Sequence, residues 1–182
     1  MAQALILVLP GWPASAPDPW PQSWVSQPGY QVVAQHNWQR PLRGDWLIRL
    51  EEAVLAASQV VVVAHDLGCI QLAAWAAHSR HTERVQGALL VAPLDVETQQ
   101  MRERLPTWSP ILRQRLPFKS GVIGSVNSAL DASQPSLAAG SQALAECWGA
   151  QWMGMLAPPT PADQQSGAWS QGQALLHELL KD

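Results

Sequence analysis

The chain has 182 residues, with 11 basic and 14 acidic side chains and a formal net charge of −3. This length predicts one domain, residues 1–182, and the weak, unclustered charge excludes a surface for nucleic acids or anionic membranes. Hydrophobic residues make up 47% of the chain and charged residues 14%, which excludes a disordered protein.

Short apolar runs alternate with helical patterns along the chain. Continuous apolar runs predict strands buried on both faces, at residues 4–9, 30–34, 60–64, 87–91 and 121–123. Apolar residues at helical spacing predict helices at residues 22–27, 46–57 with Asp45 as N-cap, 67–77, 137–148 and 171–180. This alternation predicts an α/β fold with three α/β/α layers around a doubly wound, mostly parallel sheet.

The sequence also indicates the cellular compartment and whether metal sites or disulfides are expected. The apolar start, residues 1–10, lacks the basic flank of a signal peptide, and no apolar run reaches the roughly 18 residues of a membrane-spanning helix. Cys69 and Cys147 are far apart and form no metal-ligand pair, so we expect both to be small residues of the core. We therefore expect a cytoplasmic protein without a disulfide framework, a metal or a cofactor.

The most informative segment is Ala64-His65-Asp66-Leu67-Gly68, where the strongest predicted strand runs into a helix through small residues. It has the shape of a nucleophile elbow, G-x-S-x-G, a sharp turn that exposes one side chain at the carboxyl edge of an α/β-hydrolase sheet. The exposed position carries Asp66 instead of serine. The alternative is that Asp66 serves only as the N-cap of the following helix, a role that suits aspartate.

Matching stretches distributed over nearly the whole chain carry a family resemblance. They are LPGW at 9–12, PDPWPQ at 17–22, NWQRP at 37–41, DW at 45–46, RL at 49–50, VAHDLGC at 63–69, GALLVAPLDVE at 87–97, LPF at 116–118 and WGA at 148–150. In these stretches the sequence resembles a family of small serine hydrolases, the YdeN-like and retinoblastoma-binding protein 9-like proteins. The resemblance implies a compact α/β-hydrolase fold without a lid domain and, in active members, a Ser-His-Asp triad.

The positions that match the triad carry other residues in this chain. Asp66 stands at the serine position, Asn127 or Ser128 at the acid position with Asp131 a few residues on, and Pro161 at the histidine position. Acyl transfer by a triad needs a nucleophile, a base and a group that orients the base. The resemblance and the substitutions together imply a protein without triad catalysis, serving as a binding or regulatory pseudoenzyme.

An active hydrolase that uses Asp66 is the alternative. A carboxylate at this elbow is the nucleophile in haloalkane dehalogenases and epoxide hydrolases, so small esters, epoxides or haloalkanes would be substrates. Such a reaction still needs a base that activates water. His65 should point toward the sheet, and His36 could reach the rim of a pocket. The other three histidines, which we expect at the surface, are His78, His81 and His177.

Asp66 is also expected to block acyl transfer. An elbow residue lies at a helix N-terminus, where the N–H groups of Leu67 and Gly68 and the helix dipole favour negative charge. In an active relative these donors, with the N–H near Trp12, would receive the oxyanion. We therefore expect Asp66 to be ionised, with a pKa below that of an ordinary aspartate, and hydrogen-bonded to these amides.

Tryptophans near the elbow are candidates for ligand binding, since the chain has ten of them against one tyrosine and one phenylalanine. Trp12, Trp20 and Trp38, with Leu67, would line a cleft beside Asp66 that holds an apolar or aromatic ligand. The alternative is that the tryptophans only seal the loops over the sheet. The sequence does not identify the ligand, a small molecule or a protein, and its low charge is compatible with a homodimer.

Overall fold

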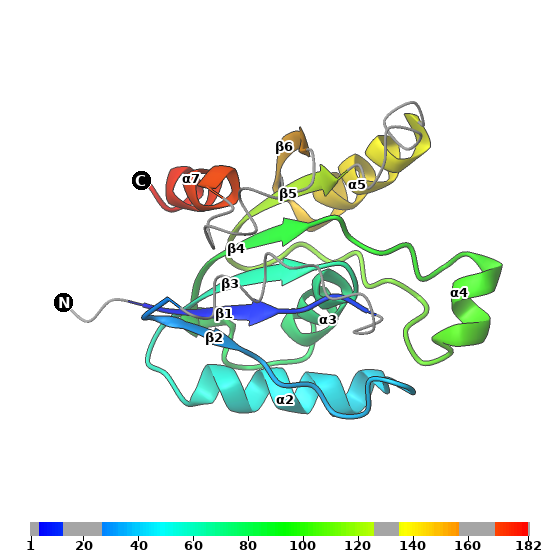
Figure 1. Cartoon of the computed structure of the whole chain (residues 1–182), viewed down its shortest axis with the longest axis horizontal. Helices are drawn as coiled ribbons and strands as arrows, with labels where there is room; N and C mark the ends of the chain where they lie inside the picture. The colour runs from blue at the N-terminus through cyan, green and yellow to red at the C-terminus, as the bar shows by residue number, and fades with distance from the viewer. Residues whose placement is uncertain (1–3, 13–26, 126–134, 157–169, 182) are drawn as a thin grey trace.

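The computed structural model describes residues 4–12, 27–125, 135–156 and 170–181. In these ranges six parallel strands form one sheet in the order β2-β1-β3-β4-β5-β6 (Figure 1). The strands are β1 (Leu5–Leu9), β2 (Tyr30–Val32), β3 (Val60–His65), β4 (Val85–Val91), β5 (Lys119–Ser125) and β6 (Gln151–Leu156). The helices are α2 (Arg43–Leu55), α3 (Leu67–Ala76), the 3-10 helix η1 (Thr82–Arg84), α4 (Gln99–Arg104), α5 (Pro135–Trp148) and α7 (Ser170–Leu180).

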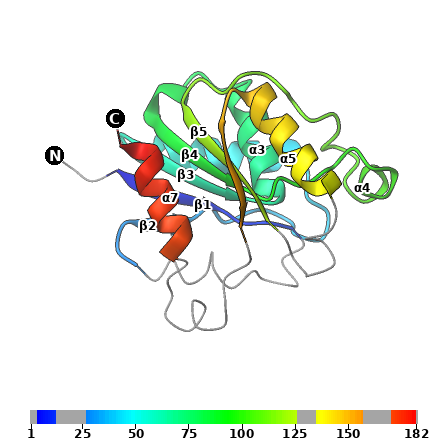
Figure 2. The same cartoon turned by 90° about the horizontal axis from the view of Figure 1, so that it is seen from above.

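The central strand β3 supplies both faces of the sheet with core residues. Val62 and Ala64 join the core that contains the buried side chains of α2, α3 and α5, whereas Val61 and Val63 join a smaller core with Leu176 of α7. Successive side chains of a strand point to opposite faces, so a run of valines buried on both sides requires cover on both sides. Figure 2 shows α3 and α5 on one side of the sheet and α7 on the other. The predicted three-layer α/β fold is confirmed.

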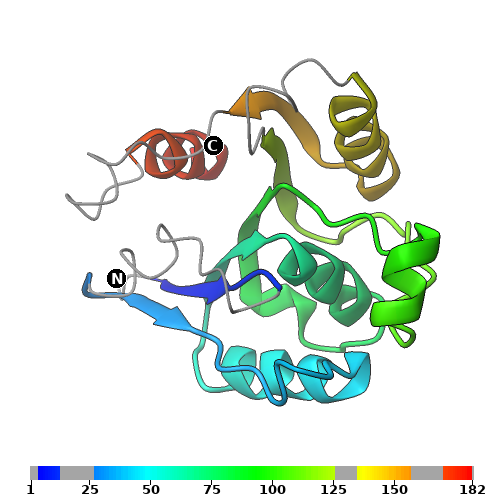
Figure 3. The same ribbon diagram turned by 45° about the vertical axis from the view of Figure 1, so that its right-hand side comes forward.

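The two edges of the sheet are built from distant parts of the chain. In Figure 3, α5 and β6 lie together at one edge, and β2 with α2 lies at the other. Strand β6 pairs with β5 in parallel and was not expected from the sequence. None of the helices in the described ranges is both long enough and apolar enough to span a membrane.

The predicted N-cap of the second helix is wrong. Helix α2 begins at Arg43, its N-cap is Leu42 without a side-chain cap bond, and Asp45 lies within the first turn. The hydroxyl of Thr107, distant in sequence, accepts a hydrogen bond of 3.1 Å from the Arg43 N–H instead. A tertiary contact therefore satisfies a backbone N–H at the start of α2, a role that the local sequence would assign to Asp45. Asp45 still lies near the positive end of the helix dipole, where a negative charge is favourable. The predicted helix at 22–27 lies, except for its last residue, outside the described residues.

Two glycines bring the loop after β1 close to the start of α3. A Cβ atom at Gly68 would lie 2.7 Å from the carbonyl oxygen of Leu9, and one at Gly11 would lie 2.8 Å from the Cβ of Asp66. Both distances are shorter than side chains tolerate, so only glycine permits the approach. The close packing of β1 on α3 fixes the turn that carries Asp66.

We predict that Gly68→Ala lowers the free energy of unfolding by about 1–3 kcal/mol, because the added methyl group meets backbone that cannot rotate away. The matched control is Gly140→Ala, at an exposed position of α5 with nothing within 4 Å of the added atom. It should raise the free energy of unfolding by about 0.5–1 kcal/mol through helix propensity. Urea denaturation measures both values, and equal effects of the two substitutions would contradict the packing account.

Candidate functional site

The turn between β3 and α3 exposes Asp66 at the carboxyl edge of the sheet. The residue has φ 53° and ψ −117°, a conformation that side chains rarely adopt. Its backbone is fixed on both sides, because its N–H donates to the carbonyl of Val91 (3.0 Å) and its carbonyl accepts from Cys69 (3.1 Å) and Leu94 (3.3 Å). This strained strand-to-helix turn has the geometry of a nucleophile elbow, and strain of this kind gathers at functional sites.

One oxygen of the Asp66 carboxylate receives two backbone N–H groups from different elements. Oδ1 accepts a hydrogen bond of 3.0 Å from Trp12, in the loop after β1, and one of 2.6 Å from Leu67, the first residue of α3. The expected bonds from Leu67 and from the region of Trp12 are thus present. Asp66 is also the N-cap of α3. An ordinary N-cap side chain reaches the second or third amide of the helix, whereas Leu67 supplies the first.

Indole N–H groups tie together the loops beside this edge. Each donates to a backbone carbonyl of another segment, which satisfies a polar group that burial would otherwise leave unpaired. The bonds run from Trp12 to the carbonyl of Trp38 (2.8 Å), from Trp46 to that of His36 (2.9 Å) and from Trp108 to that of Pro41 (2.9 Å). The Trp46 ring packs edge to face on Trp38 (5.1 Å) and Trp108 (5.2 Å). These contacts favour the loop-sealing interpretation for Trp12 and Trp38.

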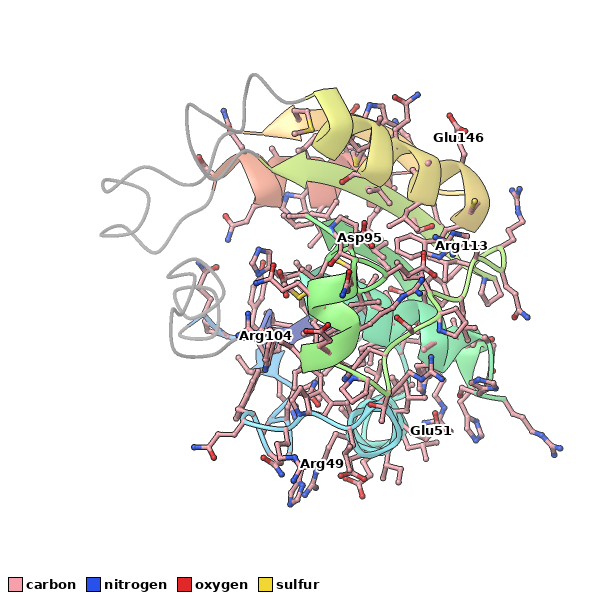
Figure 4. The ribbon with its side chains drawn as sticks, turned by 90° about the vertical axis from the view of Figure 1, so that its right-hand side faces the viewer. Arg49, Glu51, Asp95, Arg104, Arg113 and Glu146 are labelled. Carbon is pink, nitrogen blue, oxygen red and sulfur yellow. The ribbon has the colours of Figure 1, made fainter. Side chains whose placement is uncertain are left out.

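Helix α4 adds a cation to the side of the site. The guanidinium of Arg104 (Figure 4) lies over the Trp12 ring, 4.7 Å from its centre. The chain on either side of α4 is held by Glu97, which pairs with Arg113 and accepts the Ile111 N–H at 3.0 Å. The hydrogen bond from Arg113 is the main cause that lowers the pKa of Glu97 below its usual value. Glu97 therefore anchors the segment that positions Arg104.

The histidines differ in burial and in partners. His65, the last residue of β3, is buried, and its Nδ1 lies 2.7 Å from the place a Gly11 Cβ would take. His36 is exposed and lies 3.8 Å from Asp45. Of the other three, His81 is partly exposed near Glu51 and Glu83, and His78 and His177 are exposed, as expected for surface residues. In the described part of the chain no three His, Cys, Asp or Glu side chains form a group that could hold a metal.

The two cysteines differ, and the prediction that both lie in the core is wrong for one. Cys69 is buried, and its single S–H has two carbonyl acceptors within reach, those of Ala64 and Val91, each 3.4 Å from Sγ. Burial, followed by the charge of Asp66, raises the pKa of the Cys69 thiol well above its usual value, which makes it unreactive. Cys147 is exposed. The buried stripe of α5 uses positions 144, 145 and 148, and position 147 lies outside it.

Several predicted site residues lie outside the described residues. They are Trp20, Asn127, Ser128, Asp131 and Pro161. Their assignments to the ligand cleft and to the acid and histidine positions therefore stay predictions. Of the predicted set, the structure brings together Trp12, Leu67 and Asp66, with Trp38 joined to them through the Trp12 indole.

Comparison with known proteins identifies a family and supports the α/β fold. A family model described as serine hydrolase matches residues 6–178. A YdeN-like hydrolase from Pectobacterium atrosepticum superposes with a TM-score of 0.71 at 20% identity, over 98% of this chain and 91% of that one. The butyrate-bound esterase Est2 of Thermogutta terrifontis gives 0.62 at 15% identity, over 98% and 82%. A hydrolase of the α/β superfamily from Xanthomonas campestris gives 0.58 at 15%, over 98% of both chains. None of the curated proteins matches.

We predict that Glu97→Gln destabilises the protein in a pH-dependent way. Because the pKa of Glu97 is lowered in the folded state, its contribution is present above the pKa of an unfolded glutamate and is lost as pH falls through the folded pKa. Arg113 is 45% exposed, so the effect at neutral pH should be about 1 kcal/mol or less. Urea denaturation from pH 7 down into the acidic range should show wild type and variant converging.

The control for this titration is Glu52→Gln, which removes an exposed carboxylate that pairs with Arg49 within α2. Its effect at neutral pH should stay within about 0.5 kcal/mol, as is usual for exposed helix pairs. A difference between wild type and Glu97→Gln that does not change with pH would show that the carboxylate charge is not what anchors the segment.

Proposed function

Because the chain belongs to the serine hydrolase family, we propose that it is a member without triad catalysis, which keeps the α/β-hydrolase scaffold for binding or regulation. The observation that carries this proposal is the pair of hydrogen bonds from Trp12 and Leu67 to Asp66 Oδ1. In an active member of an α/β-hydrolase family, the amide after the nucleophile and an amide from a neighbouring loop form the oxyanion hole. Here a carboxylate of the chain itself occupies both donors.

This arrangement opposes acyl transfer in two ways. An oxyanion could accept hydrogen bonds from the two amides only after their hydrogen bonds to Asp66 had broken. Each such bond to a charged group is worth about 1.5–3 kcal/mol, which would add to the barrier. A carboxylate a few ångströms from the developing oxyanion would also repel it, in a site where water screens charges poorly. The donors that lower the barrier in an active relative therefore stabilise the resting state instead.

Asp66 is in addition a poor nucleophile for esters. Attack of a carboxylate on an ester would form a mixed anhydride and expel an alkoxide, which leaves far less readily than the carboxylate. The tetrahedral intermediate would return to the starting materials. Serine avoids this outcome because its alkoxide and the leaving alkoxide are similar as leaving groups. The triad also needs a histidine as base, and we predict that Pro161 stands at the histidine position in this chain.

Attack on an alkyl carbon is the second candidate function, since the same two hydrogen bonds would also position a carboxylate to displace a halide or open an epoxide. The alkyl ester so formed would need water activated by a base. Among the described residues, His36, His78 and His177 are exposed and His65 is packed beneath Gly11. The placement of these histidines supports the first proposal over the second.

We predict that the protein does not hydrolyse aryl esters and is not labelled by a serine-directed fluorophosphonate. Asp66→Ser restores the hydroxyl but not the base, so kcat/KM should stay at least about a thousandfold below the 10⁴–10⁸ M⁻¹s⁻¹ of ordinary enzymes. The matched control is Asp45→Ser, which removes one carboxylate from the first turn of α2. Spectrophotometric ester assays and intact-protein mass spectrometry provide the readouts.

Three outcomes would contradict the proposal. Labelling of the wild-type protein would mean that another serine is activated. Strong ester hydrolysis by Asp66→Ser would mean that a histidine reaches the elbow from elsewhere in the chain. Turnover of haloalkanes or epoxides, with a mass increase on the peptide that contains Asp66, would establish the second candidate function.

A further inference from the structure

A recess of about 560 Å³ opens at the edge of the sheet opposite Asp66. Lys119 and Gln151 begin β5 and β6, so the recess lies at the amino ends of these strands, whereas Asp66 follows the carboxyl end of β3. The lining residues are Arg115, Leu116, Pro117, Phe118, Lys119, Ser120, Gly149, Gln151 and Leu179. The recess is therefore separate from the elbow site and is not part of the proposed function.

The polar groups of the recess are hydrogen-bond donors. Arg115 and Lys119 contribute two positive charges, and Ser120 and Gln151 contribute a hydroxyl and an amide. None of the described residues that line the recess is acidic. Such a lining favours a ligand that is negatively charged and rich in acceptor oxygens.

Ser120 provides an observation independent of the surface charge. The residue is only 5% exposed, and its Oγ has no hydrogen-bond partner among the residues that the structure describes. A buried hydroxyl without a partner destabilises the folded state, so native proteins seldom retain one without a reason. Because Ser120 is one of the residues that line the recess, an acceptor oxygen that reached this hydroxyl would satisfy it.

Arg115 is held in place by its backbone, and no carboxylate of the described residues competes for its guanidinium. The segment that ends at Leu116 is fixed to Trp148 at two points, since Leu116 N–H donates to the Trp148 carbonyl (2.9 Å) and the Trp148 indole donates to the carbonyl of Leu112 (2.8 Å). The guanidinium packs on Gly149, where a Cβ would lie 2.8 Å from Cζ. In the described part of the chain, Arg115 has no ion pair with a carboxylate. The planar guanidinium of Arg115 is thus available to donate two parallel hydrogen bonds to two oxygens of one ligand.

From these features we propose that the recess binds a small molecule through an oxyanion, either a phosphate or a carboxylate group. Arg115 forms the main charge-assisted contact, and the Ser120 hydroxyl donates a further hydrogen bond. Lys119 lies at the rim, where its Nζ now donates to the carbonyl of Lys181 at 2.6 Å and has two further protons to offer.

The test is calorimetric titration of the full chain with inorganic phosphate and, separately, with succinate at low ionic strength, where exposed charges are least screened. We expect one ligand per chain for at least one of the two anions, which also identifies the class of oxyanion. Arg115→Gln should weaken binding at least about tenfold, the loss of one bidentate contact. Arg80→Gln, an exposed arginine outside the recess, should leave the affinity unchanged.

Ser120→Ala separates a binding role from a structural one. Removal of an unpaired buried hydroxyl should not lower the melting temperature of the free protein, yet it should reduce the rise in melting temperature that the anion produces. Absence of binding by both anions up to about 10 mM, or equal losses from Arg115→Gln and Arg80→Gln, would overturn the proposal. An unchanged anion-induced rise in Ser120→Ala would overturn the role of the hydroxyl.

Discussion

A single carboxylate oxygen, Oδ1 of Asp66, connects the loop after β1 to the first turn of α3 by accepting the N–H groups of Trp12 and Leu67. The contact depends on Gly11 and Gly68, since a Cβ at either position would collide with the neighbouring element. An acceptor in this place satisfies two backbone donors that would otherwise require a substrate or water. The two donated hydrogen bonds favour the charged form of the Asp66 carboxyl.

The fold around this contact is an α/β-hydrolase fold, and the exposed position of the elbow carries a carboxylate instead of a hydroxyl. Asp66 keeps the strained elbow conformation that pushes a nucleophile outward. Indole N–H groups of Trp12, Trp46 and Trp108 fasten the adjacent loops to backbone carbonyls. A preorganised site with a fixed anion suits recognition better than acyl transfer, which is why we propose binding or regulation as its use.

The sequence predicted those parts of the structure that local pattern determines. The run of valines in β3, the small residues of α3 and the elbow between them were recognisable because burial on all sides leaves a continuous apolar signal. Strand β6 was missed, since Gln151 and Gly154 interrupt any alternation and pairing with β5 creates the strand. Thr107 in place of Asp45 as the cap of α2 is likewise a long-range contact.

The candidate site was predictable only in part. The motif located Asp66, helix electrostatics identified Leu67 as its donor, and loop sealing by tryptophans was one of two alternatives. The carbonyls that accept from the indoles could not be predicted, because they lie in segments distant in sequence. The recess could not be predicted from the sequence either, because Arg115, Gly149 and Gln151 come together only in the folded sheet.

The most direct test of the account is the ionisation of Asp66 in the wild-type protein. Carboxyl ¹³C resonances of labelled aspartate, with Asp66 assigned through Asp66→Asn, would be followed from pH 8 to pH 5. The account predicts an Asp66 resonance that stays at the position of a carboxylate throughout, because two N–H donors and the start of a helix favour the charge. Uptake of a proton by Asp66 near neutral pH would contradict it.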